Sequence, residues 1–408
     1  MAADGTTNGR TEVLHYESES GTAKAPRHES ESGGGGRYES LLVALMFVLV
    51  IALPLASNLT GHDGADPQAE NRELAAMPRF DGSLNSLAAF PNGFSAWFED
   101  HFGFRALLIR WYGESRLLVL HVSPSTTVVD GRDGWLFYGD DGGTQDYANE
   151  TPLTRSEVDV WRTALVRARD WLASRGIAYV FTMAPDKHVI YPEKEPASIR
   201  RIGPTSRMDQ VFTALASTGV SAVDVRPALA AARARERIYF LTDTHWNDRG
   251  AFVAYQQIID AVRRQVPAVP PPWTRADFQP AERTIEGLDL AGMIGLTRVL
   301  HETDLTLTPI RPRQAKVIEP RGAEATAEEG YLVTEIPGST LPRAVIFRDS
   351  FTSRLVPYLS EHFSRAVYLW QNDFDADVVE REHPDVVIQE IVGRHLYEFI
   401  PSPELVPR

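Results

Sequence analysis

The sequence predicts an α/β domain of three layers at about residues 131–395, with a parallel sheet covered by helices on both faces. Short apolar segments alternate with segments of helical periodicity from residue 151 onward. The apolar segments are largely apolar at every position, as in strands that are buried on both faces. Polar residues that can carry chemistry gather in loops after such segments, where α/β sheets hold their reactive groups.

The N-terminal part does not belong to this domain. Residues 1–40 are rich in Gly, Ser, Glu and Thr, and this composition predicts a disordered tail. Residues 41–57 carry no charge, and their length is near the lower limit for crossing a bilayer, so residues 41–59 predict a transmembrane anchor. A cleaved signal peptide is the alternative, although a leader of this length before the apolar run is unusual.

The charges around the apolar run predict its orientation. Lys24, Arg27 and Arg37 precede the run, whereas acidic residues come after it. The positive-inside rule therefore places the tail in the cytoplasm and the rest of the chain outside it, in the periplasm or on the cell surface.

A stalk and helical lead-in are expected over residues 60–130. Residues 94–120 place large apolar and aromatic side chains between charged ones, with a break at Gly103. Residues 131–138, GRDGWLFY, then predict a turn that enters an aromatic strand.

The elements of the main domain are predicted from local signals. Thr154 and Glu157 form a capping box before apolar residues at helical spacing, and Gly176 ends that helix. Strands are expected at 177–184, 220–225, 238–240, 343–347, 365–370 and 385–391. Further helices are expected at 206–217, after Pro227, from Asp248 to about 264, and at 352–362 and 375–382. Residues 265–340 carry no pattern that places them, and residues 396–408 are expected to form a tail.

Composition excludes several classes of function. The 408 residues carry a formal net charge of −14, so no basic footprint for nucleic acid is present. The chain contains no cysteine, which excludes disulfides, thiolate catalysis and cysteine-ligated metals. The sequence implies no cofactor.

The first chemically promising loop contains Asp243 and His245. In an extended segment, positions i and i+2 point the same way, so the carboxylate could hold the imidazole as a general base requires. Two other interpretations stay open on the local sequence. The pair could be a helix cap with a structural histidine, or it could be half of a metal site.

The second loop contains Ser350, at the point where a buried strand turns into a helix. Backbone N–H groups at a helix N-terminus can stabilise an oxyanion beside such a serine. The alternative is that Asp349 or Ser350 only caps the helix. Ser353 is a weaker candidate, since it lies within the first helical turn.

Five further residues are candidates for binding substrate. Lys187 and Tyr191 come after the strand at 177–184 and could face the same crevice, although a solvated lysine and a packed tyrosine would explain them equally well. Arg348 lies beside the candidate serine. Trp135 and Trp246 could stack on sugar rings, and buried aromatic packing is the alternative.

Four blocks of sequence resemble one family. They are GRDGWLFY at 131–138, APDKHVIYP at 184–192, TDTHWN at 242–247 and RDSF at 348–351. These blocks resemble the alginate O-acetyltransferase family, the SGNH-hydrolase-like proteins of the AlgJ/AlgX type. The resemblance spans about residues 70–395, and it implies a permuted, flavodoxin-like parallel sheet.

The resemblance also implies roles. Ser350 would be the nucleophile, His245 its base and Asp243 the partner of the base. The activity would be transfer of acetyl groups to an exported polysaccharide, with the acetyl group delivered by a membrane-bound O-acyltransferase. An acetyl esterase and a non-catalytic glycan-binding or assembly protein are the rival functions.

Two departures from ordinary SGNH hydrolases matter. In those proteins the serine lies near the N-terminus in a Gly-Asp-Ser block, whereas here it comes after the Asp–His pair and Arg348 stands at the glycine position. The glycine and asparagine that usually complete the oxyanion hole are therefore not assignable from the sequence.

Overall fold

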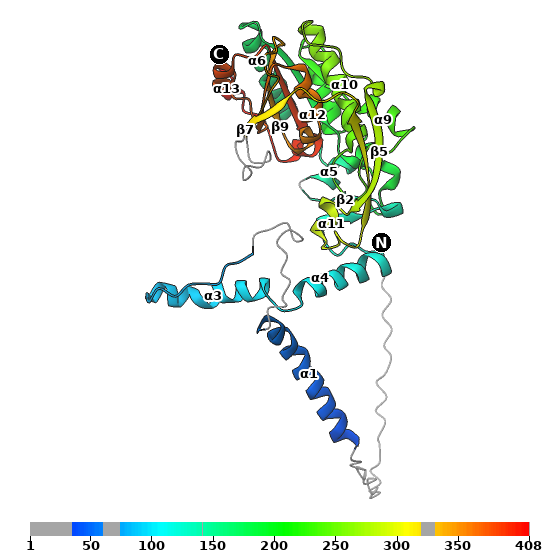
Figure 1. Cartoon of the computed structure of the whole chain (residues 1–408), viewed down its shortest axis with the longest axis vertical. Coiled ribbons are helices and arrows are strands. Elements are labelled where there is room, and N and C mark those ends of the chain that lie inside the picture. Colours follow the sequence, from blue (N-terminus) through cyan, green and yellow to red (C-terminus); the bar gives the residue numbers. More distant parts are fainter. Residues whose placement is uncertain (1–34, 60–73, 141, 320–330, 408) are drawn as a thin grey trace, which may run out of the picture. The chain divides into compact units, whose positions relative to one another are not determined.

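The computed structural model describes residues 35–59, 74–140, 142–319 and 331–407 (Figure 1). Residues 1–34 of the predicted 1–40 tail, and the acidic residues that follow the apolar run, lie outside the described residues, whereas residues 35–40 are helical and not disordered. The chain divides into two units, Met1–Ala56 and Ser57–Arg408.

Helix α1 (Gly35–Leu59) contains the uncharged run of the sequence and begins before it. In the part of the chain that the structure describes, no helix has both the length and the apolarity needed to cross a membrane.

The second unit contains a seven-stranded sheet with the order β4-β3-β11-β9-β10-β8-β7. Its strands are β3 (Ala178–Ala184), β4 (Ser221–Asp224), β7 (Lys316–Glu319), β8 (Tyr331–Glu335), β9 (Arg343–Arg348), β10 (Arg365–Trp370) and β11 (Val386–Val392). The five strands from β4 to β10 are parallel, whereas β8 and β7 join antiparallel. The prediction of a wholly parallel sheet is therefore wrong at one edge, because β7 and β8 come from the segment without a readable pattern.

Helices cover both faces of the sheet, which confirms the three predicted layers. The main ones are α6 (Arg155–Ala173), α8 (Arg207–Leu215), α9 (Arg226–Arg233), α10 (Asp248–Gln265), α12 (Val356–Leu359) and α13 (Ala376–Glu382). Alternate strand residues point to opposite faces. Val180, Ile346 and Ile388 pack with α9 and α10, whereas Phe181 and Val345 pack with α6 and α8. The capping box at Thr154 is present as predicted.

The remaining elements are not part of this sheet. Before it lie α3 (Leu84–Asp100), α4 (Arg105–Glu114), the π-helical turn Ser115–Val119, β1 (Val128–Asp130), β2 (Leu136–Tyr138) and α5 (Gly143–Ala148). The short helix α7 (Lys187–Ile190) comes after β3. Strands β5 (Phe278–Glu286) and β6 (His301–Pro309) form a hairpin that encloses α11 (Asp289–Met293).

Two predicted elements differ from the structure. The expected strand 238–240 makes only an isolated bridge between Tyr239 and Trp246. The expected helix 352–362 is broken into the 3₁₀ turn Ser350–Arg354, α12 and a second 3₁₀ turn, with a proline in the first turn of α12. Proline lacks the N–H that would continue the preceding turn.

The C-terminal residues are part of the domain and not a loose tail. Leu396 lies in the 3₁₀ turn Gly393–Tyr397, and Leu396 and Val406 are buried in the same core as α6. The predicted boundary at residue 395 is therefore too early, because a few apolar residues between prolines gave no periodic signal.

We predict that Leu396→Ala destabilises the domain by about 2–5 kcal/mol, because it removes buried methyl groups and leaves a cavity. The measurement is unfolding by urea. Leu405→Ala is the matched control, since Leu405 is 47% exposed and its truncation should change the free energy of unfolding little. Equal effects of the two variants would contradict the packing of this segment.

Candidate active site

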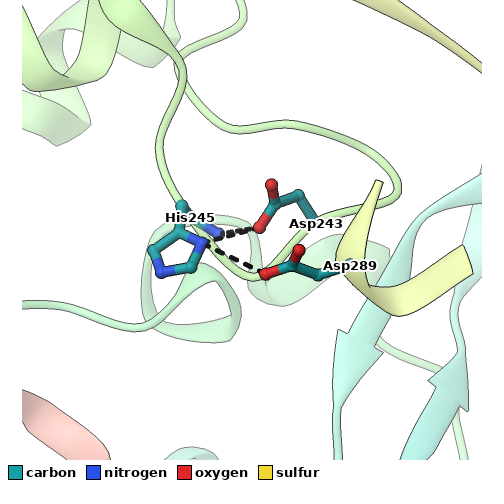
Figure 2. A group of neighbouring side chains, drawn as sticks. All are labelled: Asp243, His245 and Asp289. Carbon is teal, nitrogen blue, oxygen red and sulfur yellow. Dashed lines mark hydrogen bonds and ion pairs between the residues drawn. The ribbon is translucent and has the colours of Figure 1, made fainter. Parts of the chain in front are cut away.

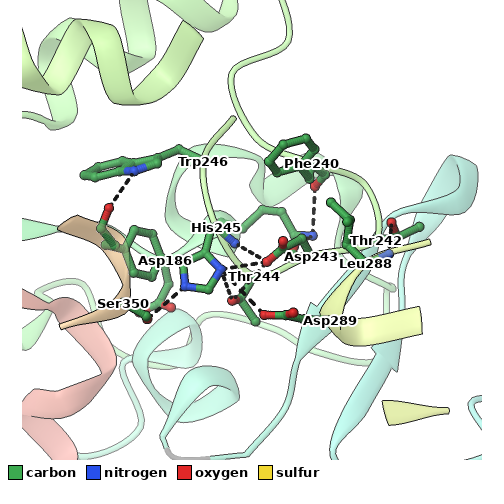
Figure 3. Close-up of polar contacts among 12 residues, drawn as sticks. Asp186, Phe240, Thr242, Asp243, Thr244, His245, Trp246, Leu288, Asp289 and Ser350 are labelled. Carbon is green, nitrogen blue, oxygen red and sulfur yellow. Dashed lines mark hydrogen bonds and ion pairs between the residues drawn. The ribbon is translucent and has the colours of Figure 1, made fainter. Parts of the chain in front are cut away.

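The candidate serine lies at the carboxyl end of the sheet. Ser350 comes after strand β9 and begins a 3₁₀ turn, whose N-cap Asp349 accepts a hydrogen bond from Phe351 N at 2.9 Å. The Asp243–His245 loop is closed by the Tyr239–Trp246 bridge and comes shortly before α10, and its histidine faces the serine (Figure 3).

One imidazole joins the two predicted loops. His245 Nε2 lies 2.8 Å from Ser350 Oγ, and His245 Nδ1 lies 2.7 Å from Asp243 Oδ1 (Figure 3). Asp243 Oδ1 also accepts a hydrogen bond from the backbone N of His245 at 3.0 Å. His245 thus contacts both of the expected partners, and this order of groups is the one in which histidine can act as a general base.

The charges of this pair support each other. Burial opposes the charged imidazolium, but the charge and hydrogen bond of Asp243 outweigh burial, so the pKa of His245 is raised. Burial likewise opposes the carboxylate of Asp243, and His245 overcomes it, so the pKa of Asp243 is lowered. Asp243 therefore stays ionised and can stabilise the imidazolium that forms when Ser350 loses its proton.

Asp289 is a site residue that the sequence analysis missed. Its carboxylate Oδ2 lies 3.7 Å from His245 Nδ1, and its side chain is 52% exposed (Figure 2). It begins α11, in the segment without a readable pattern, and no local motif marks it. Asp289 reaches the site because α11 docks on the histidine loop, where Leu290 N donates to Thr242 O at 3.0 Å.

Asp243, His245 and Asp289 also form the group of described residues that could hold a metal ion. Both carboxylates approach the same imidazole nitrogen, Nδ1. A metal on Nδ1 would replace the proton that His245 shares with Asp243, so the metal site and the hydrogen-bonded triad exclude each other. The contact of Nε2 with Ser350 favours the triad.

Lys187 has a structural place instead of the predicted substrate-binding one. Its side chain is buried, and Nζ donates to the carbonyl oxygens of Phe240 at 3.0 Å, Leu241 at 3.1 Å and Asp243 at 2.5 Å. Burial lowers the pKa of Lys187 to about 7, although the nearby carboxylates oppose this. All three ammonium hydrogens are used by the loop, so none remains for a substrate.

Glu302 completes the support of the same loop. Its Oε2 accepts from Leu241 N at 2.6 Å and from Thr242 N at 3.0 Å, and its Oε1 pairs with Arg237 at 2.8 Å. The sequence contained no indication of this role, because Glu302 lies about 60 residues from the loop it holds.

The structure also places the predicted Tyr191 and Trp135 away from a substrate. Both are buried, and their rings lie 4.3 Å apart between centroids. The Tyr191 hydroxyl accepts from Ile238 N at 3.0 Å. The packing interpretation therefore holds for both aromatic residues.

Trp246 and Arg348 are buried as well, and their side chains bond to the backbone of the serine turn. Trp246 Nε1 donates to Phe351 O at 3.1 Å, which ties the histidine loop to the serine turn. Arg348 Nη1 donates to Asp349 O at 3.2 Å and to Ser353 Oγ at 3.1 Å. Both residues shape the serine turn from behind.

A cavity of about 360 Å³ opens beside the serine. It is lined by Asp243, His245, Asp248, Asp289, Ser350, Ser353, Arg354 and Pro357. Two of these lining residues, Arg354 and Asp248, form an ion pair at 3.1 Å. A small acyl group and a hydroxyl could reach Ser350 here.

Comparison with known proteins identifies the family. The family described as "SGNH hydrolase-like domain, acetyltransferase AlgX" matches residues 128–373, which is more than half of the chain. The chain belongs to this family. The expected SGNH-hydrolase-like fold is thereby confirmed, with a mixed sheet in place of the wholly parallel one.

Individual relatives match shorter regions. The probable alginate O-acetylase AlgJ of Pseudomonas syringae pv. tomato is 30% identical over 149 residues, 34% of this chain and 34% of that protein. The protein of the same name from Pseudomonas aeruginosa is 27% identical over 201 residues, 47% of each chain. The chain thus matches a third to a half of the length of these relatives. The solved O-acetyltransferase domain of Pseudomonas putida AlgJ has 21% identity and a TM-score of 0.44, and covers 68% of this chain and 96% of that one.

We predict that Asp289→Asn lowers the pKa of His245, because one of the negative charges that favour the imidazolium is lost. The midpoint of the His245 imidazole titration, followed by NMR of histidine-labelled protein, should move to lower pH. Asp248→Asn is the control, since Asp248 lines the same cavity but pairs with Arg354. A midpoint that stays or rises in Asp289→Asn would contradict the coupling.

Proposed function

We propose that the chain is an O-acetyltransferase that moves an acetyl group through an acyl-Ser350 onto hydroxyls of an exported polysaccharide. The observation that carries this proposal is the hydrogen-bonded line from Asp243 through His245 to Ser350 at the carboxyl end of the sheet. Family membership and the names of the AlgJ relatives support the choice of acetyl and polysaccharide.

In the first half-reaction, Ser350 Oγ attacks the carbonyl carbon of an acetyl ester while His245 Nε2 takes the serine proton. The carbonyl electron pair moves to oxygen and then returns, and the bond to the donor alkoxide breaks. The alkoxide leaves with the proton from His245, and the acetyl group stays on Ser350.

In the second half-reaction, His245 removes the proton of a sugar hydroxyl, whose oxygen attacks the acetyl carbon. The bond to Ser350 Oγ breaks, and the serine recovers its proton from His245. Asp243 keeps the imidazole in one tautomer through both steps.

The rival functions differ in the fate of the acyl-serine. Water can attack the same intermediate, which would make the protein a polysaccharide acetyl esterase. A glycan-binding or assembly protein would keep the fold without using the serine. The hydrogen bond between His245 Nε2 and Ser350 Oγ favours the two catalytic alternatives, since binding alone does not need it.

We predict that Ser350→Ala and His245→Ala each lose nearly all chemical rate, and that Asp243→Asn loses about 10³ to 10⁴-fold, because the imidazole is held in the wrong tautomer. Mass spectrometry after exposure to an activated acetyl ester should find the adduct on Ser350. Ser353→Ala is the matched control, since Ser353 lines the same cavity.

The polysaccharide then separates the three functions. Glycan O-acetylation should fall in cells that carry Ser350→Ala. A rise would support the esterase, and no change would support the non-catalytic protein. Loss of activity after chelation of metals would instead support a metal site at Asp243, His245 and Asp289.

We also propose that residues 41–59 anchor the chain in the cytoplasmic membrane, and that a membrane-bound O-acyltransferase supplies the acetyl group. The uncharged run and the basic residues before it support the anchor. The supply of acetyl groups rests on the resemblance to alginate O-acetyltransferases.

We predict that a reporter active only outside the cytoplasm is active when fused after Arg408, because the positive-inside rule places the domain there. The measurement is the activity of the reporter in cells that carry the fusion. Activity of a cytoplasm-only reporter at the same site would contradict this topology, and a mature chain that begins near Ser57 would show a cleaved signal.

A further inference from the structure

Arg394 is a buried cation at the carboxyl end of strand β11, the strand next to that of the serine. Its Nη1 donates to Asp186 Oδ1 at 2.6 Å, and its backbone N donates to Asp186 Oδ2 at 2.9 Å. The side chain of Arg394 is only 9% exposed and that of Asp186 only 3%. This ion pair therefore fixes the guanidinium in one place.

The topology brings Arg394 to the same end of the sheet as the serine. Strand β11 lies between β3, which leads to Asp186, and β9, which leads to Ser350. Asp349 Oδ2 accepts a hydrogen bond from Val392 N at 2.5 Å, which joins the end of β11 to the serine turn. Arg394 lies two residues beyond that joint.

Contacts with the residue after the nucleophile confirm this place. The guanidinium carbon of Arg394 lies 5.7 Å from the ring centroid of Phe351, and the His245 ring lies 4.8 Å from the same ring. Arg394 and His245 therefore both border Phe351. The positive charge of Arg394 also opposes protonation of His245 and lowers its pKa, against the larger effect of Asp243.

The ion pair does not use all the donors of Arg394. Its buried Nε has no hydrogen-bond partner among the described residues. Burying a charged group with unsatisfied donors is costly, so a guanidinium in this state needs either a compensating gain or an anion that arrives during function. An anion does arise beside Ser350, because the carbonyl oxygen of an attacked ester becomes negatively charged.

We propose that Arg394 is a catalytic residue that donates an N–H to the acyl oxyanion at Ser350, and that Asp186 is its positioning residue. The proposal rests on the proposed function. As the bond between Ser350 Oγ and the acetyl carbon forms, the serine proton passes to His245 Nε2 and the carbonyl electron pair moves to oxygen beside the guanidinium. When that pair returns, the donor alkoxide leaves with the proton from His245. Arg394 thereby takes the role of the glycine and asparagine donors, which could not be assigned from the sequence.

The test measures acetylation of Ser350 in the full-length protein with 4-nitrophenyl acetate. Arg394→Gln should lower the acylation rate constant by about 10²–10³-fold, the usual effect of removing one oxyanion donor. The KM for the ester should change less than about threefold, because the donor acts on charge that develops only in the transition state. Asp186→Asn should lower the rate less, since the guanidinium remains but is held less firmly.

Arg207→Gln is the matched control for a structural effect. Arg207 is also buried. Its Nη1 donates to Leu396 O in the C-terminal segment at 2.5 Å, and its Nε donates to Thr151 O at 2.8 Å. Arg207→Gln should lower the midpoint temperature of unfolding and leave the acylation rate constant of the folded protein unchanged. If Arg207→Gln lowers that rate constant as much as Arg394→Gln does, the effect is structural and the proposal is wrong.

The remaining outcomes are also decisive. A folded Arg394→Gln variant that acylates within about threefold of the parent rate overturns the proposal. If that variant does not fold, Arg394→Lys decides, because an ammonium lacks the planar fork of N–H groups that pairs with Asp186 and leaves a further donor for the oxyanion. Its rate should fall at least about tenfold, and an unchanged rate overturns the proposal. Ser350→Ala tests the proposed function separately from the role of Arg394. If an acetyl adduct still forms in Ser350→Ala, the proposed function is wrong. If Ser350→Ala forms no adduct and Arg394→Gln acylates at the normal rate, only the role of Arg394 is wrong.

Discussion

The geometry of the site depends on the buried ammonium of Lys187. Among the described residues, the loop that carries His245 pairs with strands only through one bridge and the hydrogen bond from Leu136 N to Leu241 O, so its other carbonyl groups need other donors. Lys187 supplies three of these hydrogen bonds at once, and Glu302 accepts from two N–H groups of the same loop. Because burial lowers the pKa of Lys187 to about 7, this support costs free energy that the three carbonyls must offset.

The sequence predicted the parts of the fold that local physics determines. Apolar runs marked the five parallel strands, and the capping box marked the start of α6. The pairing of Asp243 with His245 was predicted from their spacing, and the serine turn from its place after a buried strand. The predicted bounds differ from the structure at the C-terminus and in the broken helix after Ser350. In both places prolines interrupt the helical spacing of apolar residues, and the chain forms short 3₁₀ turns.

The features that the sequence could not predict depend on contacts between distant segments. Asp289 reaches His245 only because the helix it begins is docked on the backbone of Thr242. Lys187 looked like a loop residue, since nothing near it in the chain reveals that β3 ends beside the histidine loop. An exposed lysine and a buried lysine therefore look alike in the sequence. Whether the side chain is buried depends on how the whole sheet packs.

The loops of the site are all held in place by buried polar side chains. Lys187 comes after β3, Asp349 after β9 and Arg394 after β11, and each residue or its partner is buried and bonded to a neighbouring loop. Behind the serine turn, Glu390 is buried and bonded to Thr352 Oγ1 at 2.8 Å, and burial and the charge of Asp349 raise its pKa well above the usual range. The raised pKa favours the neutral form of Glu390, which spares Asp349 a like charge beside it. Asp349 accepts from Phe351 N in the serine turn and from Val392 N at the end of β11, and so joins the two. These buried polar groups therefore bond the loops to one another where strand pairing ends. Their hydrogen bonds, and not those of the sheet, set the distance between serine and histidine.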